Sequence, residues 1–83
     1  MSNNTQILIL DNDLTSLTTL ERLLHSLGEV TYFSNEIDFI NYIKINTNPG
    51  LIIIDTNSPR FNGYDILSKV KNNPLLKDVP VLL

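Results

Sequence analysis

The sequence comprises 83 residues, of which 42% are hydrophobic and 18% are charged, and this ordinary globular composition is sufficient for one small domain. The formal net charge of −3 argues against a basic surface that binds nucleic acid directly, and no apolar run is long enough to span a membrane. The lack of cysteine excludes disulfides and thiol chemistry, and it favours a cytoplasmic protein.

The first predicted strand is the apolar run of residues 7–10, which ends on an acidic segment. A run without polar alternation is typical of a strand that is covered on both faces in a parallel sheet. Asp13 is then expected to cap a helix that continues to about residue 27, with Gly28 in the position that ends it. The inward-facing residues of this helix are expected to be its leucines, Leu14, Leu17, Leu20, Leu23, Leu24 and Leu27.

A second strand is predicted over residues 30–33, and Ser34 or Asn35 can cap the helix that follows it. This helix is expected to end near Ile45, because the polar and turn-forming residues 46–50 break it. Its inward-facing residues are expected to be Ile37, Phe39, Ile40 and Ile43.

The third predicted strand, residues 51–54, consists of four apolar residues and ends on Asp55. A loop then leads to Gly63 and to a helix over residues 64–70. The inward-facing residues of that helix are expected to be Ile66, Leu67 and Val70. A fourth strand is predicted over residues 79–83.

Strands and helices alternate along the whole chain, and this order predicts an α/β fold with a parallel sheet and right-handed crossovers. Helices are therefore expected on both faces of the sheet. Residues 1–83 contain no internal repeat, low-complexity tract or linker, so they are expected to form a single domain.

Acidic residues follow two of the predicted strands. Asp11 and Asp13 come after the first strand and Asp55 after the third, so neighbouring parallel strands would bring all three to one edge of the sheet. Clustered carboxylates repel one another and are stabilised by a divalent cation or a proton. Oxygen ligands without cysteine favour Mg²⁺ over zinc. An aspartate in such a position can also simply cap the next turn, and that alternative stays open for each residue alone.

The segments ILILDND (7–13), LIIIDTNSP (51–59), NGYD (62–65) and DVPVL (78–82) together resemble the receiver domain of two-component response regulators. The resemblance covers essentially the whole chain and implies a flavodoxin-like, three-layer fold. The sheet order would be 2-1-3-4, without the fifth strand and the last two helices of the family.

The resemblance also implies roles for particular residues. Asp55 would accept a phosphoryl group from a partner histidine kinase or phosphotransfer protein. Mg²⁺ would be held by Asp11, Asn12, Asp55 and the backbone carbonyl of Asn57. Pro59 and Gly63 would shape the loop rather than take part in chemistry. Such a protein is a phosphoacceptor with at most weak autophosphatase activity, not an enzyme in the usual sense.

The sequence departs from the family pattern at Asn12, which occupies the position of a second acid that usually binds the metal. An amide oxygen can coordinate Mg²⁺ but adds no charge, so weaker metal affinity is expected. Asp13, one residue further on, can either cap the helix or contribute to the metal site.

A second departure is that the chain ends within the fourth strand, before the family's Ser/Thr and Lys, which contact the phosphoryl group. Phosphorylation is therefore expected to be impaired in this form. The fourth strand, interior in the family, would present an exposed apolar edge. This predicts a homo-oligomer through that strand, or a fragment of a longer receiver.

Two other functions fit parts of the sequence. A pseudo-receiver would dimerise or bind a partner without any phosphate chemistry. Alternatively, the segment DNDLT (11–15) resembles the signature of haloacid-dehalogenase-type phosphatases, with Asp11 as nucleophile and Asp13 as general acid/base. The phosphatase hypothesis leaves the segment from Asp55 to Gly63 unexplained.

Overall fold

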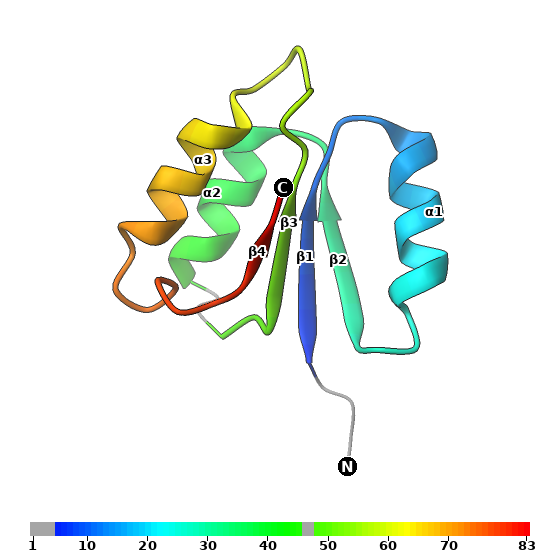
Figure 1. The fold of residues 1–83 in the computed structure, drawn as a ribbon, viewed down its shortest axis with the longest axis horizontal. Coiled ribbons are helices and arrows are strands. Elements are labelled where there is room, and N and C mark those ends of the chain that lie inside the picture. Colours follow the sequence, from blue (N-terminus) through cyan, green and yellow to red (C-terminus); the bar gives the residue numbers. More distant parts are fainter. Residues whose placement is uncertain (1–4, 46–47) are drawn as a thin grey trace.

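Residues 5–45 and 48–83, which the computed structural model describes, form a sheet of four parallel strands with helices on both faces (Figure 1). In chain order the elements are β1 (Gln6–Leu10), α1 (Leu14–Leu24), β2 (Glu29–Phe33), α2 (Glu36–Ile45), β3 (Leu51–Ile54), α3 (Gly63–Lys71) and β4 (Val81–Leu82). The strand order is β2-β1-β3-β4. The predicted three-layer α/β fold and its sheet order are confirmed.

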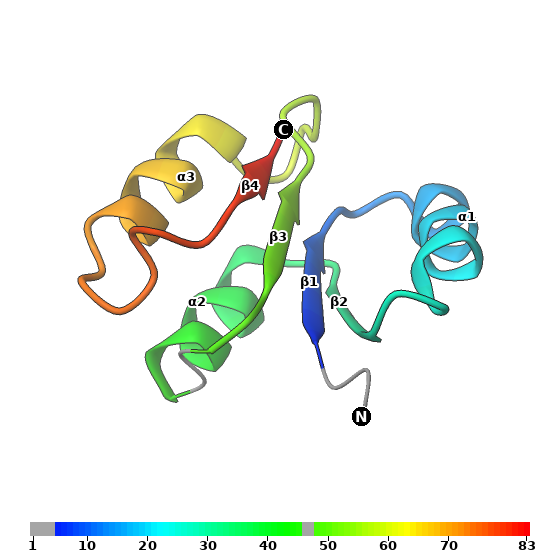
Figure 2. The same ribbon diagram turned by 60° about the horizontal axis from the view of Figure 1, so that its bottom comes forward.

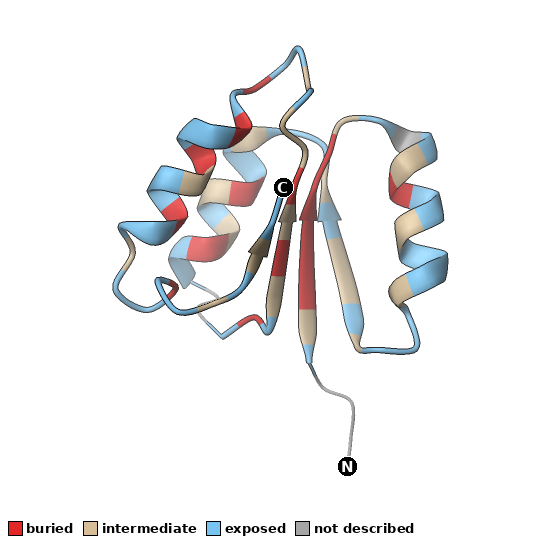
Figure 3. Ribbon diagram, in the orientation of Figure 1, coloured by how far each residue is buried: buried red, intermediate tan, exposed pale blue. Residues whose placement is uncertain are grey.

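Two apolar layers lie on opposite faces of the sheet because successive strand residues point in opposite directions. Leu8 and Leu10 of β1 join Ile52 and Ile54 of β3 on the face covered by α2 and α3. Ile7 and Ile9 point the other way and pack against Leu17 of α1. Figure 3 shows the buried residues concentrated in the two central strands and on the inner sides of α2 and α3. This double burial explains why β1 and β3 have no polar alternation in the sequence.

Helix α1 is shorter than predicted. It ends at Leu24 with His25 as its C-cap, and Leu23 and Leu27 are 66% and 60% exposed, so the prediction that these two leucines face inward is wrong. The leucines of α1 that pack against the sheet are only Leu17, Leu20 and Leu24 among the described side chains, because the helix lies mainly over β1 and β2. The side chain of Leu14 lies outside the described part of the chain.

Gly28 was predicted in the position that ends helix α1, but the helix ends four residues earlier, at Leu24, and the φ of Gly28 is not positive. Instead it lies where the chain enters β2 and passes close to Thr5. A Cβ atom on Gly28 would come within 2.1 Å of the Thr5 carbonyl oxygen, so the backbone spacing itself requires glycine here.

Helix α2 buries Phe39 and Ile43, as predicted, while Ile37 is 72% exposed and does not face the core. Of the two predicted caps, Asn35 is the one used: its Oδ1 accepts a hydrogen bond from the backbone N–H of Asp38 at 2.8 Å. Of the residues predicted to break the helix, 46 and 47 lie outside the described residues.

Strand β4 contains two residues instead of the predicted five, and it pairs with β3 at the edge of the sheet (Figure 2). Pro80 precedes it and contributes only its carbonyl, which accepts the N–H of Ile52 at 3.0 Å. Leu82 is 56% exposed, and its register partner Ile53 is half-buried on the side of α1. Helix α1 therefore leaves part of the apolar surface of β3 and β4 uncovered.

A helix that spans a membrane must be both long and apolar, and none of the helices of the described residues meets both requirements.

Candidate functional site

The carboxyl ends of β1 and β3 carry the two aspartates that the sequence singles out. The last residues of the strands, Leu10 and Ile54, are register partners, and Asp11 and Asp55 follow them directly. The N–H of Asp55 donates to the Leu10 carbonyl at 2.9 Å, which extends the ladder to the aspartate itself. The two side chains therefore start from the same edge of the sheet, as predicted.

Asp11 is the buried acidic residue of this edge, with 9% of its surface exposed. Burial raises the pKa of the Asp11 carboxyl, and the neighbouring Asp55 raises it further through charge repulsion and a side-chain contact. A hydrogen bond from the Asp13 N–H, 2.9 Å from Asp11 Oδ1, opposes the increase. Two carboxylates in contact at a partly dry edge favour the binding of a cation or a proton.

Asp13 does not join this pair, because its carboxylate caps helix α1. Its Oδ1 accepts from the N–H of Thr15 at 3.0 Å, and its Oδ2 accepts from the Ser16 hydroxyl at 3.2 Å. Within residues 5–45 and 48–83, no group of three or more acidic, histidine or cysteine side chains is placed to hold a metal ion. Of the two interpretations of Asp13, the structure supports the cap, and the acidic centre consists of two carboxylates.

The loop between β3 and α3 is held in place by hydrogen bonds from its own residues. The N–H of Asn57 donates to Asp55 Oδ1 at 2.9 Å and orients that carboxylate. The Ser58 hydroxyl donates to Asn12 Oδ1 at 3.0 Å and accepts from the Arg60 N–H at the same distance. Ser58 therefore connects the loops that follow β1 and β3. Sequence reasoning missed this role, since the partners are 46 positions apart and only the local turn around Ser58 could have been suspected.

Helix α3 begins beside Asp55, with Asn62 as its N-cap and Gly63 as its first residue. Asn62 Oδ1 accepts from the N–H groups of Tyr64 and Asp65, at 3.0 and 3.1 Å, and so caps the helix. A Cβ atom on Gly63 would lie 2.6 Å from the Asp55 carbonyl oxygen and 3.0 Å from Thr56 Cα. Glycine is needed here for space and not for a positive φ. The described residues contain no cis peptide bond, so Pro59 is trans.

The donor set at this edge fits Mg²⁺, which binds one or two carboxylates and retains several waters. Asp11 and Asp55 supply the charge, and the pKa of Asp11 is raised by burial and, less strongly, by repulsion from Asp55, which a cation would relieve. Asn12 is half-buried beside them, and its amide oxygen already accepts one hydrogen bond, from Ser58, with one lone pair remaining. Asn57 is exposed, so its backbone carbonyl belongs to an accessible part of the loop.

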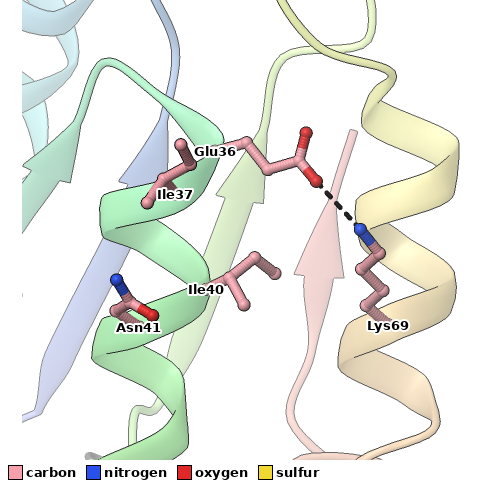
Figure 4. A pocket seen from close by; sticks show the side chains of 5 residues that line it. All are labelled: Glu36, Ile37, Ile40, Asn41 and Lys69. Carbon is pink, nitrogen blue, oxygen red and sulfur yellow. Dashed lines mark hydrogen bonds and ion pairs between the residues drawn. The ribbon is translucent and has the colours of Figure 1, made fainter.

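Concavities of the described surface lie both beside this edge and away from it. A polar concavity of about 400 Å³ is lined by Asn12, Ser34, Asn35 and Arg60. Through Asn12 it adjoins the sheet edge that carries Asp11 and Asp55, which we call the acidic edge. A second concavity, of about 250 Å³, lies between α2 and α3 and is crossed by the ion pair of Glu36 and Lys69 at 2.9 Å (Figure 4). None of the residues lining the second concavity belongs to the acidic edge, and we assign it no role in the chemistry.

Comparison with known proteins places these features in a family context, although no family model matches the sequence. The chain is 32% identical over 91 residues to chemotaxis protein CheV1 of Helicobacter pylori, an alignment that covers 98% of this chain and 27% of CheV1. It is 30% identical over 83 residues to protein PilG of Pseudomonas aeruginosa, covering 99% of this chain and 61% of PilG. The chain is a homologue of the response regulators.

The solved structure of chemotaxis response regulator CheY4 of Vibrio cholerae shares the fold of this receiver domain. Its TM-score is 0.82 at 18% identity, and the superposition covers 94% of this chain and 65% of that of CheY4. The relatives above confirm the predicted family, and the CheY4 structure confirms the predicted flavodoxin-like fold. This receiver spans less than two thirds of the length of CheV1 and of PilG.

Proposed function

We propose that this receiver accepts a phosphoryl group on Asp55 in a two-component phosphorelay. The observation that carries the proposal is the position of Asp55, which ends a central strand at the edge shared with Asp11. The donor would be a histidine kinase or a phosphotransfer protein. The chain itself would be a phosphoacceptor in the cytoplasm, with at most weak autophosphatase activity.

In the proposed transfer, an oxygen of the Asp55 carboxylate attacks the phosphorus of a phosphohistidine. The new P–O bond gives an acyl phosphate, the P–N bond breaks, and the imidazole nitrogen keeps the electron pair. The N–H of Asn57 fixes the carboxylate through Oδ1 and thereby limits its rotation. Because phosphoryl transfer depends mostly on positioning and charge neutralisation, two adjacent carboxylates need a positive charge before an anionic donor can approach.

We propose Mg²⁺ as that charge. Asp11, Asp55 and the backbone carbonyl of Asn57 would hold it, and Asn12 would coordinate it directly or through a water. When bound, the cation would neutralise the carboxylates and the incoming phosphoryl oxygens. Asn12 contributes no charge and already accepts a hydrogen bond from Ser58, which supports the expectation of weaker metal affinity.

The exposed edge at β4 supports a further part of the proposal, a homo-oligomer formed through this strand. An unpaired strand edge next to exposed Leu82 and Leu83 can be paired by a second copy. Analytical ultracentrifugation at micromolar concentrations tests it, and a stable monomer would contradict it.

The alternative functions are not favoured. A dehalogenase-type phosphatase would use Asp13 as general acid/base, but that carboxylate is engaged in capping helix α1. A pseudo-receiver without phosphate chemistry would have the same fold but would remain unlabelled in the following experiment.

The test is labelling of the chain by a phosphorylated histidine kinase in the presence of Mg²⁺, read by intact mass and peptide mapping. We expect slow addition of one phosphoryl group on Asp55, none in Asp55→Asn, and a strong reduction in Asp11→Asn. Asp78→Asn, an exposed aspartate outside the site, is the charge-matched control and should be labelled normally. Labelling of Asp11 would support the phosphatase hypothesis, and an unlabelled chain without Mg²⁺ affinity would identify a pseudo-receiver.

A further inference from the structure

The polar concavity beside the acidic edge has a charge opposite to that of its surroundings. Of its lining residues, Arg60 is the one that carries a charge, and none is acidic. The Arg60 guanidinium forms no ion pair with a carboxylate of the described residues, whereas Lys69 bonds to both Glu36 and Asp65. A pocket of about 400 Å³ with an uncommitted guanidinium is suited to an oxyanion.

The hydrogen bonds around the pocket determine which other groups face a ligand as donors. Asn12 Oδ1 is occupied by the Ser58 hydroxyl, so its two N–H donors are free of any acceptor within the described residues. Asn35 contributes less, because both ends of its amide are bonded to Asp38, at 2.8 and 2.9 Å. The hydroxyl of Ser34 completes the lining. The pocket thus presents a guanidinium, an amide and a hydroxyl as donors.

The position of this pocket relative to Asp55 suggests its purpose. Asn12 follows Asp11 directly and lines the pocket, while Arg60 lies on the loop that Asp55 begins. Ser58 holds both sides together, through its hydroxyl to Asn12 and through the N–H of Arg60. An anion held by Arg60 and Asn12 would therefore lie next to the phosphoacceptor and not at a remote surface.

We propose that Arg60 and the Asn12 amide form a binding site for the phosphoryl group of a small acyl phosphate before transfer to Asp55. The site offsets the repulsion between the anionic donor and the two carboxylates. In the transfer that follows, the Asp55 oxygen attacks phosphorus, the P–O bond to the acyl group breaks, and the carboxylate leaves with the electron pair. Arg60 acts as a positioning residue. The role in transfer rests on the proposed function, whereas anion binding does not.

The first experiment measures binding alone, with inorganic phosphate as the probe. The full chain is titrated without Mg²⁺ at constant ionic strength, and the backbone amide shifts of Asn35 and Arg60 are followed by NMR. We expect a saturable shift that weakens about tenfold or more in Arg60→Gln, the size typical of losing a charge-assisted hydrogen bond. Arg60→Lys should retain part of the affinity, because lysine keeps the positive charge. It should lose the rest, because an ammonium group cannot make the bidentate hydrogen bonds of a guanidinium.

Arg22→Gln is the matched control. Arg22 is also exposed and its loss changes the net charge equally, but it lies in the last turn of α1. It should bind phosphate like the wild type. Equal losses in both variants would mean that only net charge matters, and an unsaturable wild-type titration would mean that the pocket is no site. Either result overturns the proposal.

Asn12→Asp separates the anion site from the metal site. The added carboxylate should weaken phosphate binding and strengthen Mg²⁺ binding, since it removes two donors and adds a charged ligand. If Asn12→Asp binds phosphate as well as the wild type does, the amide has no part in the site and the proposal fails in that respect.

The second experiment measures the rate of Asp55 labelling by acetyl phosphate. In Arg60→Gln we expect a higher half-saturating donor concentration with a similar rate at saturation, which a general structural defect would not produce. Unchanged half-saturation would refute the donor role while leaving Asp55 phosphorylation intact. Phosphate binding that depends on Arg60 in a chain whose Asp55 is never labelled would refute the proposed function and the donor role, and leave the anion site standing.

Discussion

Replacement of Gly63 by alanine tests whether tertiary contact or local helix preference decides the start of α3. Gly63 is the first residue of that helix, where alanine is intrinsically better by up to about 1 kcal/mol. The new Cβ would nevertheless lie 2.6 Å from the Asp55 carbonyl oxygen and 3.0 Å from Thr56 Cα. Both atoms belong to the backbone and cannot turn away as a side-chain end could.

Overpacking of this kind costs about 1–3 kcal/mol, and the backbone contacts place Gly63→Ala toward the upper end of that range. After the gain in helix preference, we expect a net loss of about 1–2 kcal/mol in the free energy of unfolding. For a domain of this size the melting temperature would fall by roughly 4–8 °C for each kcal/mol. Because the clash displaces the backbone of Asp55, labelling of Asp55 should also become slower.

The assay is urea unfolding followed by circular dichroism, with Gly50→Ala as the control. A Cβ on Gly50 would come within 2.5 Å of the Thr5 methyl group, which is the end of an exposed side chain and can rotate. Gly50→Ala should therefore change stability much less than Gly63→Ala. A Gly63→Ala chain as stable as the wild type would show that the contact with Asp55 is not restrictive, and the reasoning would be wrong.

Three further predictions follow from the hydrogen bonds and charges of the site. Asp13→Ala should lower the free energy of unfolding by about 1 kcal/mol through loss of the α1 cap, measured by urea unfolding; an unchanged midpoint would contradict the capping role. Ser58→Ala should cost about 0.5–1.5 kcal/mol and broaden the amide signals of the β3–α3 loop in NMR, and a loop that stays sharp would show that Ser58 does not hold it. Because the pKa of Asp11 is raised in the folded chain, the native state binds more protons than the unfolded state above the ordinary value of 3.8, and stability falls as pH rises through the raised pKa. Asp11→Asn should therefore be at least as stable as the wild type at neutral pH without Mg²⁺; marked destabilisation would contradict that sign.

The candidate site was only partly visible in the sequence. Asp11 and Asp55 could be placed because each follows a fully apolar run, and parallel strands bring such positions to one edge. The hydrogen bond between Ser58 and Asn12 could not be predicted, because it joins two loops whose relative position depends on the packing of the sheet. The pocket containing Arg60 depends on three separate loops and leaves no sign in the spacing of residues.

By itself, the sequence determined the order of strands and helices, the parallel sheet, the candidate capping residues of the first two helices, and the two aspartates at the edge. These features depend on local pattern: apolar runs, helical spacing and residues whose side chains bond to nearby N–H groups. The tertiary structure alone decided that α1 ends at Leu24, that Ile37 faces solvent and that β4 contains only two residues. Each of these depends on how much of an apolar face a neighbouring element covers, and that area is set by packing between distant segments, which local pattern does not encode.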